Sequence, residues 1–181
     1  MEISALSNHS IKIKTKNSAF VLDPDGKNLD ADALIYTKPQ ENLPEDKLII
    51  DGAGEYEVGG VYIKGERVAG SLVYEFTNDS KKLLVVSSSA ALKSLDTEDY
   101  SVVIVKAEEK LDSANLSTIG SELVIVYGPS ENVVVDAESV KCTDKDLSPS
   151  DSMKKAKDLL DAEQQTQSST GSAKKLQQIT K

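Results

Sequence analysis

Few residues in this chain of 181 residues have the types that a hydrolytic site needs. His9 is the only histidine, Asp23 follows an apolar run, and serines occupy positions 87–89 after another apolar run. A histidine base, an aspartate that orients it and a serine nucleophile recur in hydrolases. However, no glycine elbow surrounds these serines, and a serine-rich strand end is commonly a turn or a helix cap. The sequence therefore favours a structural role for these residues over a catalytic one.

A second candidate site is the carboxylate pair of Glu55 and Glu57. On a strand these residues share one face, where they could perform acid–base chemistry or hold a divalent cation weakly. A solvated strand face with Tyr56 packed on the opposite side is the simpler interpretation. The preceding Gly-Ala-Gly at 52–54 does not begin a dinucleotide-binding loop, because Glu57 replaces the third glycine and no helix pattern follows. We predict a strand, a tight glycine turn and a returning strand.

Charge and composition narrow the classes of partner. Thirty acidic and 21 basic residues give a net charge of −9, which disfavours nucleic acids and anionic membranes. Cys142 is the only cysteine, so an internal disulfide and a cysteine-based metal site are excluded. The N-terminal residues do not resemble a secretion signal, and no apolar stretch is long enough to span a bilayer. We therefore expect a cytoplasmic protein.

Short apolar runs dominate the first 142 residues. Alternating apolar residues on either side of positions 16–18 predict a β-hairpin. Apolar runs at 83–86, 102–105 and 123–126 are continuous, as in strands that are covered on both faces. Short helices at 89–95 and 113–119 are expected to connect these strands as βαβ crossovers. Other strands are predicted at residues 33–36, 48–50, 61–63, 72–76 and 133–135.

Residues 143–181 differ in composition from the rest of the chain. They include no aromatic residue and only six of Leu, Ile and Met, too few to bury the apolar surface that an ordered domain needs. We predict one domain at residues 1–142 and a polar, largely disordered tail at residues 143–181. A helix at 151–165 is the one regular element that the tail could contain.

Four segments in order resemble small bacterial hydrolases of the metallo-β-lactamase fold. The family's G-P-G-E-Y-E-x-x-G segment is similar to residues 52–60, and its opening G-H-S corresponds to Asn8-His9-Ser10, with Asn8 in place of the glycine. Its I-D-P and A-D-x-x-x-x-T segments are similar to residues 22–24 and 31–37. The matched positions in the glycine segment are Gly52, Gly54, Glu55, Tyr56, Glu57 and Gly60. The resemblance implies a strand-rich α/β fold, a β-sandwich with short covering helices, and a loop-bracing role for His9 and Asp23.

The family's metal-binding motif is missing from this sequence. In the family the threonine is followed by H-x-H-x-D-H, which holds one or two metal ions. The corresponding positions here are Lys38, Gln40, Asn42 and Leu43. The two later strand ends that carry ligands in the family correspond here to Ser87 and Tyr127 and their neighbours. The resemblance therefore implies a degenerate member without a metal site.

Two hypotheses about function follow from the sequence. The first is a non-catalytic domain, a pseudoenzyme without a cofactor, that binds a protein partner or a second copy of itself. The second is a hydrolase with a rebuilt site around His9 and Asp23. The first hypothesis is favoured because a catalytic zinc site needs three protein ligands, and the family's ligand positions here hold residues that do not form such a site.

Overall fold

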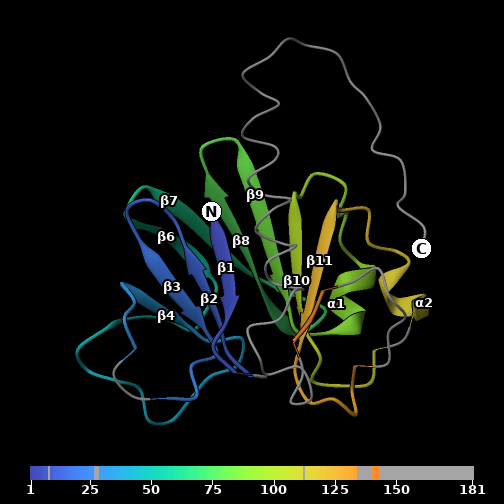
Figure 1. Cartoon of the computed structure of the whole chain (residues 1–181), viewed down its shortest axis with the longest axis horizontal. Coiled ribbons are helices and arrows are strands. Elements are labelled where there is room, and N and C mark those ends of the chain that lie inside the picture. Colours follow the sequence, from blue (N-terminus) through green and yellow to red (C-terminus); the bar gives the residue numbers. More distant parts are fainter. Residues whose placement is uncertain (8, 27–28, 112, 134–139, 143–181) are drawn as a thin grey trace.

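Two mixed β-sheets face one another in the computed structural model (Figure 1). The structure describes residues 1–7, 9–26, 29–111, 113–133 and 140–142. The five-stranded sheet has the order β1-β2-β3-β4-β5, with bounds Glu2–Ala5, Ile11–Lys14, Ala19–Leu22, Ala33–Ile35 and Leu48–Ile50. The seven-stranded sheet has the order β12-β11-β10-β9-β8-β7-β6, with bounds Val140–Cys142, Leu123–Tyr127, Val102–Lys106, Lys81–Val86, Ser71–Asn78, Val61–Val68 and Gly54–Val58.

The main core lies between the two sheets, where alternating side chains of most strands meet. In the five-stranded sheet these side chains belong to alternate positions, as in β2, where Ile11 and Ile13 are fully buried and Lys14 is exposed. Phe20 of β3 meets Phe76 of β8 edge to face, with the ring centroids 5.7 Å apart. This contact ties the two sheets together at the centre of the core.

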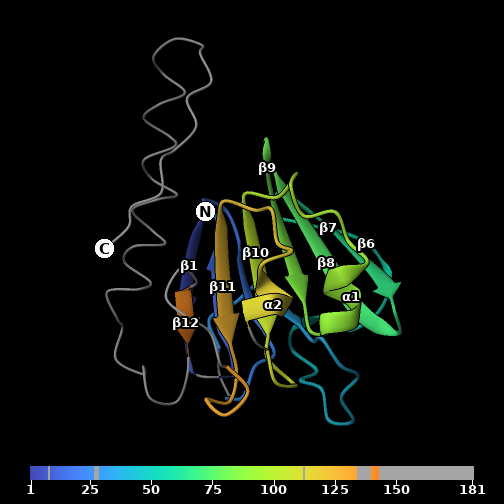
Figure 2. The same ribbon diagram turned by 90° about the vertical axis from the view of Figure 1, so that its right-hand side faces the viewer.

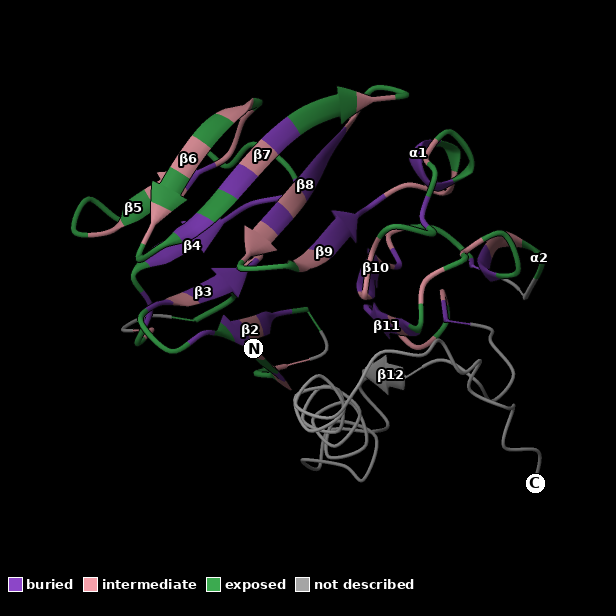
Figure 3. Ribbon diagram, turned by 90° about the horizontal axis from the view of Figure 1, so that it is seen from above, coloured by how far each residue is buried: buried purple, intermediate pink, exposed green. Residues whose placement is uncertain are grey.

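Two short helices cover the outer face of the seven-stranded sheet (Figures 2 and 3). Helices α1 (Ser89–Lys93) and α2 (Ser113–Leu116) follow β9 and β10, which pair in parallel with the next strand. Ser88 caps α1, because its Oγ accepts hydrogen bonds from the amides of Ala90 and Ala91. Apolar residues on both faces of β9 and β10 are consequently buried, as the continuous runs predict.

The outer face of the five-stranded sheet is covered differently. In the part of this face that the structure describes, no helix lies on the sheet, and residues 36–47 join the parallel strands β4 and β5 as a loop. Pro39 and Pro44 keep the residues that precede them extended. A small apolar cluster fills the space beneath the loop: Val21, Ala31, Leu34 and Tyr36, with Leu29, Leu43 and Ile49 packed against them.

Tight turns join β6, β7 and β8 into an antiparallel meander. Gly59 and Gly60 both have positive φ angles, of 58° and 80°, in the turn between β6 and β7. A Cβ atom at Gly59 would lie 2.7 Å from the Cβ of Ser18, so space as well as backbone conformation requires glycine there.

The predicted strand pattern is largely confirmed. The hairpin around residues 16–18 is β2–β3, and strand exceeds helix among the described residues. Both helices occur but are shorter than expected. The prediction of a returning strand after the glycine turn is wrong, because β5 and β6 belong to different sheets and residues 51–53 cross between them. The sequence also failed to reveal β1, whose four residues contain only one fully buried side chain.

Other predictions fall on residues that the structure does not describe. The tail at 143–181, its helix at 151–165 and the last two residues of the strand predicted at 133–135 lie outside the described ranges. No helix in the described part of the chain has the length and hydropathy needed to cross a lipid bilayer. The division into a domain and a tail stays a prediction.

Candidate functional site

Polar residues gather where β3, β4, β10 and β11 reach their carboxyl ends. Asp23 follows β3, Thr37 follows β4 by two residues, Lys106 ends β10 and Tyr127 ends β11. Asp23 and Thr37 lie at the same end of one sheet because β3 and β4 are parallel, and Lys106 and Tyr127 lie at the same end of the other because β10 and β11 are parallel. Since the two sheets face one another, the two pairs of residues meet. We call these four residues and Glu108 the Asp23 cluster.

Asp23 is the acceptor at the centre of this cluster. Its Oδ1 accepts hydrogen bonds from the amide and the hydroxyl of Thr37, each at 2.9 Å. Its Oδ2 accepts one from the Tyr127 hydroxyl at 2.8 Å and lies 3.0 Å from the Nζ of Lys106. The side chains of Asp23 and Lys106 are only 9% and 17% exposed. A buried carboxylate is therefore neutralised by a buried ammonium from the other sheet.

The remaining contacts extend this ion pair toward the surface. Lys106 Nζ lies 3.2 Å from the Thr37 hydroxyl and 3.3 Å from Oε1 of Glu108. The other carboxylate oxygen of Glu108 lies 2.5 Å from the Nζ of Lys38. Burial, and then the neighbouring Asp23 carboxylate, raise the pKa of the Tyr127 hydroxyl well above its usual value, so Tyr127 stays a donor at neutral pH.

Asp23 adopts a backbone conformation that fits this role. Its φ of 44° lies in the left-handed region, which few residues other than glycine, asparagine and aspartate adopt. Its backbone amide donates to the carbonyl of Ile35 at 2.8 Å. The chain therefore turns sharply at the end of β3, and the turn keeps the carboxylate between the two sheets.

The four residues at the positions of the family's metal-binding motif do not point toward one common site. Lys38 reaches Glu108, whereas the side-chain amide of the exposed Gln40 donates to the carbonyl of Lys38 at 3.4 Å. Asn42 and Leu43 lie on the other side of the loop, where they line a separate hollow. The segment that contains them is a loop, as Pro39 and Pro44 favour.

The residue types of the Asp23 cluster do not fit a metal ion. Only Asp23 and Glu108 carry groups that commonly bind metals, and Lys106 places a positive charge between them. Within the described residues, no group of three or more His, Cys, Asp or Glu could hold a metal ion. Glu55 and Glu57 lie exposed on β6, the edge strand of the seven-stranded sheet, with Tyr56 half-buried between them.

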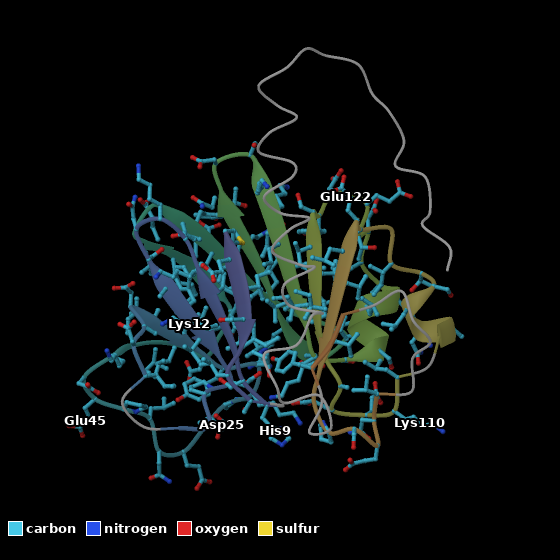
Figure 4. All side chains as sticks on the ribbon, viewed as in Figure 1. His9, Lys12, Asp25, Glu45, Lys110 and Glu122 are labelled. Atoms are coloured by element: carbon cyan, nitrogen blue, oxygen red, sulfur yellow. The ribbon has the colours of Figure 1, made fainter. Side chains whose placement is uncertain are left out.

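The structure does not bring His9 to Asp23. The His9 side chain is exposed and its backbone amide donates to the Ser7 hydroxyl at 3.1 Å, while Ser7 itself donates to Asp25. Figure 4 shows His9 at the same end of the molecule as Asp25, with its side chain directed away from the sheets. Among the hydrogen bonds and ion pairs of the described residues, none joins His9 to Asp23.

The candidate nucleophiles have different surroundings. Ser88 caps α1, and the Ser89 hydroxyl donates to Glu109 at 2.5 Å. This bond, and a second one from the Ser89 backbone amide at 3.1 Å, lower the pKa of the Glu109 carboxyl. Ser87 is buried and lines a small hollow beside Thr37 and Lys38. The helix-cap interpretation of the serine run is thus confirmed for Ser88.

Comparisons with solved structures identify the arrangement of the sheets. The chain superposes on a Thermotoga maritima protein assigned to the Zn-dependent hydrolases of the metallo-β-lactamase superfamily, with a TM-score of 0.52 and 17% identity. The alignment covers 69% of this chain and 74% of that one. This chain has the metallo-β-lactamase fold. The strand-rich architecture implied by the sequence resemblance is therefore confirmed.

Two other solved structures align with lower scores. One is the metallo-β-lactamase-fold protein YhfI from Bacillus subtilis, with a TM-score of 0.49, 8% identity and coverage of 68% of this chain and 80% of that one. The other is a diphosphatase of the PhnP family, with a TM-score of 0.46, 10% identity and coverage of 71% and 78%. No sequence-family model and no curated protein sequence match the chain.

Sequence reasoning identified part of the Asp23 cluster. The sequence points to Asp23 and, through the family resemblance, to Thr37 and Tyr127, but not to Lys106 or Glu108. A usable signal was the lysine that ends the continuous apolar run at 102–105, because a polar residue at the carboxyl end of a buried parallel strand lies where sites commonly form.

Proposed function

We propose that this chain is a metallo-β-lactamase-fold domain that has lost metal-dependent hydrolysis and acts by binding a protein partner. The observation that carries the proposal is the ammonium of Lys106, which lies 3.0 Å from Asp23 among the strand ends. A fixed ammonium supplies the positive charge that the buried carboxylate needs. A metal ion at this place would meet electrostatic repulsion from Lys106.

The surroundings of Asp23 also argue against the alternative of a rebuilt hydrolase site around His9 and Asp23. Three residues, Thr37, Tyr127 and Lys106, already donate to its carboxylate. A histidine base needs a free acceptor to orient it. We therefore favour a structural role for Asp23, which holds the ends of four strands together.

The surface best suited to a partner is a hollow of about 750 Å³ on the outer side of the five-stranded sheet. It lies between the loop of residues 36–47 and the segment after β3. Leu29, Leu34, Tyr36, Leu43 and Pro44 contribute apolar surface, and Asp25, Glu41, Glu45 and Asp46 contribute carboxylates. We call it the acidic hollow.

Charge indicates which kind of partner fits the acidic hollow. Among the described residues that line it, the only cation is Lys47, whose Nζ donates to the carbonyl of Ala31 at 3.2 Å. Within the described part of the chain, Glu41, Glu45 and Asp46 take part in no ion pair. A second copy would place the same carboxylates against these, so self-association through this face is disfavoured. An amphipathic peptide segment with lysine or arginine beside apolar residues complements the hollow.

Photo-crosslinking in the cells that make the protein tests this surface. A photoreactive residue in place of the exposed Asn42 is expected to capture a protein partner, and reversal of two charges by Glu45→Lys and Asp46→Lys is expected to reduce capture several-fold. The same photoreactive residue in place of Glu57, exposed on β6, serves as the control. Equal capture from both positions, or capture that survives the charge reversal, would contradict the proposed surface.

A further inference from the structure

A second, smaller hollow lies beside the Asp23 cluster and has the opposite charge. It has a volume of about 110 Å³ and lies between the start of the β4–β5 loop, the β7–β8 hairpin and the end of β9. We call it the small hollow. Its polar lining consists of Thr37, Lys38, Arg67, Ser71, Ser87 and Glu108.

Positive charge exceeds negative charge in the small hollow. Arg67 is the only arginine of the chain, and it takes part in no ion pair among the described residues. Glu108 is the only lining carboxylate, and its two oxygens contact Lys38 and Lys106. The exposed Arg67 thus has no carboxylate partner among the described residues, although the net charge of the chain is −9.

Ser87 adds a hydroxyl to the lining of the small hollow. The residue is only 5% exposed. Among the described residues, no hydrogen bond involves the Ser87 hydroxyl. Every side-chain N or O atom of these residues that is fully enclosed by protein does have a hydrogen-bond partner. The Ser87 Oγ is therefore not enclosed by protein atoms, and its hydroxyl is accessible to a group inside the small hollow.

We propose that the small hollow binds one small oxyanion, of the phosphate type. A guanidinium binds two oxygens of such an anion at once, and the Ser87 hydroxyl can donate to a third. The volume equals that of about three or four molecules of liquid water, which admits a phosphate group but not a nucleotide. This inference goes beyond the protein-binding role, since it concerns a different ligand and a different hollow.

Titration of the full-length chain with inorganic phosphate tests the proposal. We expect saturable shifts of the backbone amide signals of Ser87 and Gly70, which both line the hollow. Arg67→Gln is expected to weaken phosphate binding by about tenfold or more, because it removes charge-assisted hydrogen bonds. Ser87→Ala is expected to weaken binding by a smaller factor while retaining the fold. Sulfate should compete with phosphate for the same signals.

The control variant is Lys64→Gln, which removes a half-exposed cation of β7 that pairs with Glu66 outside the hollow. It should leave the phosphate affinity unchanged. Equal weakening by Lys64→Gln and Arg67→Gln, or equal shifts with sodium chloride at matched ionic strength, would overturn the proposal. The absence of saturable binding would overturn it as well. None of these outcomes depends on whether the acidic hollow binds a partner.

Discussion

Replacement of Lys106 by methionine is expected to lower the free energy of unfolding by about 2–4 kcal/mol. The substitution keeps the apolar part of the side chain but leaves the Asp23 carboxylate, which is 9% exposed, without its cation. Thr37 and Tyr127 would still donate hydrogen bonds to Asp23. The loss of stability should therefore be smaller than for a fully buried carboxylate without any partner. Chemical denaturation monitored by circular dichroism measures the effect.

Two further variants isolate the contribution of the buried charge. Lys64→Met removes a cation whose ion pair with Glu66 is about half exposed, and it should change stability by less than about 0.5 kcal/mol. The double variant Asp23→Asn, Lys106→Met should lose less than the sum of its single changes, because no unpaired carboxylate remains. If Lys106→Met behaves like Lys64→Met, the ion pair does not hold the strand ends together.

Gly65→Ala in β7 is expected to destabilise the protein by about 1–3 kcal/mol through overpacking. A Cβ atom there would lie 2.6 Å from the carbonyl oxygen of Gly52 and 2.9 Å from the ring of Tyr74. Tyr74 is fully buried, and its hydroxyl donates to the carbonyl of Tyr36 at 2.9 Å, next to Thr37. Gly65 thus permits the packing that fixes the end of β4. Thermal or chemical unfolding measures the loss.

Gly52→Ala is the matched control for this prediction. Gly52 belongs to the same contact, yet a Cβ atom there would meet no atom within 4 Å. Its replacement should therefore have a much smaller effect on the unfolding midpoint than Gly65→Ala. Similar midpoints for the two variants would show that the backbone near Gly52 moves away at little cost.

The local elements could be predicted from the sequence because their signals are local. Continuous apolar runs identified β9, β10 and β11 as strands covered on both faces, and Pro39 and Pro44 disfavour a helix between β4 and β5. The boundary between the sheets was not predicted. Residues 51–53 have the glycine content of a hairpin turn, and only the packing of β5 and β6 into different sheets distinguishes a crossover from a hairpin.

The site depended on contacts between residues far apart in the chain. Asp23 meets Lys106 and Tyr127 only because the two sheets face one another, and periodicity predicts strands without their partners. The resemblance to a family pointed to Asp23, Thr37 and the strand end at Tyr127 as candidate site positions. It did not indicate Lys106, because none of the segments that carry the resemblance includes residue 106.

Our proposal that the chain has lost metal-dependent hydrolysis can be tested by an activity assay with added metal. The purified full-length chain is incubated with Zn²⁺ or Mn²⁺ and assayed against esters, phosphodiesters and lactams, beside His9→Ala and Asp23→Ala variants. We predict no turnover that depends on the added metal and no difference among the three proteins. Metal-dependent turnover in the unaltered chain that disappears in Asp23→Ala would contradict the proposal and identify the chain as an enzyme.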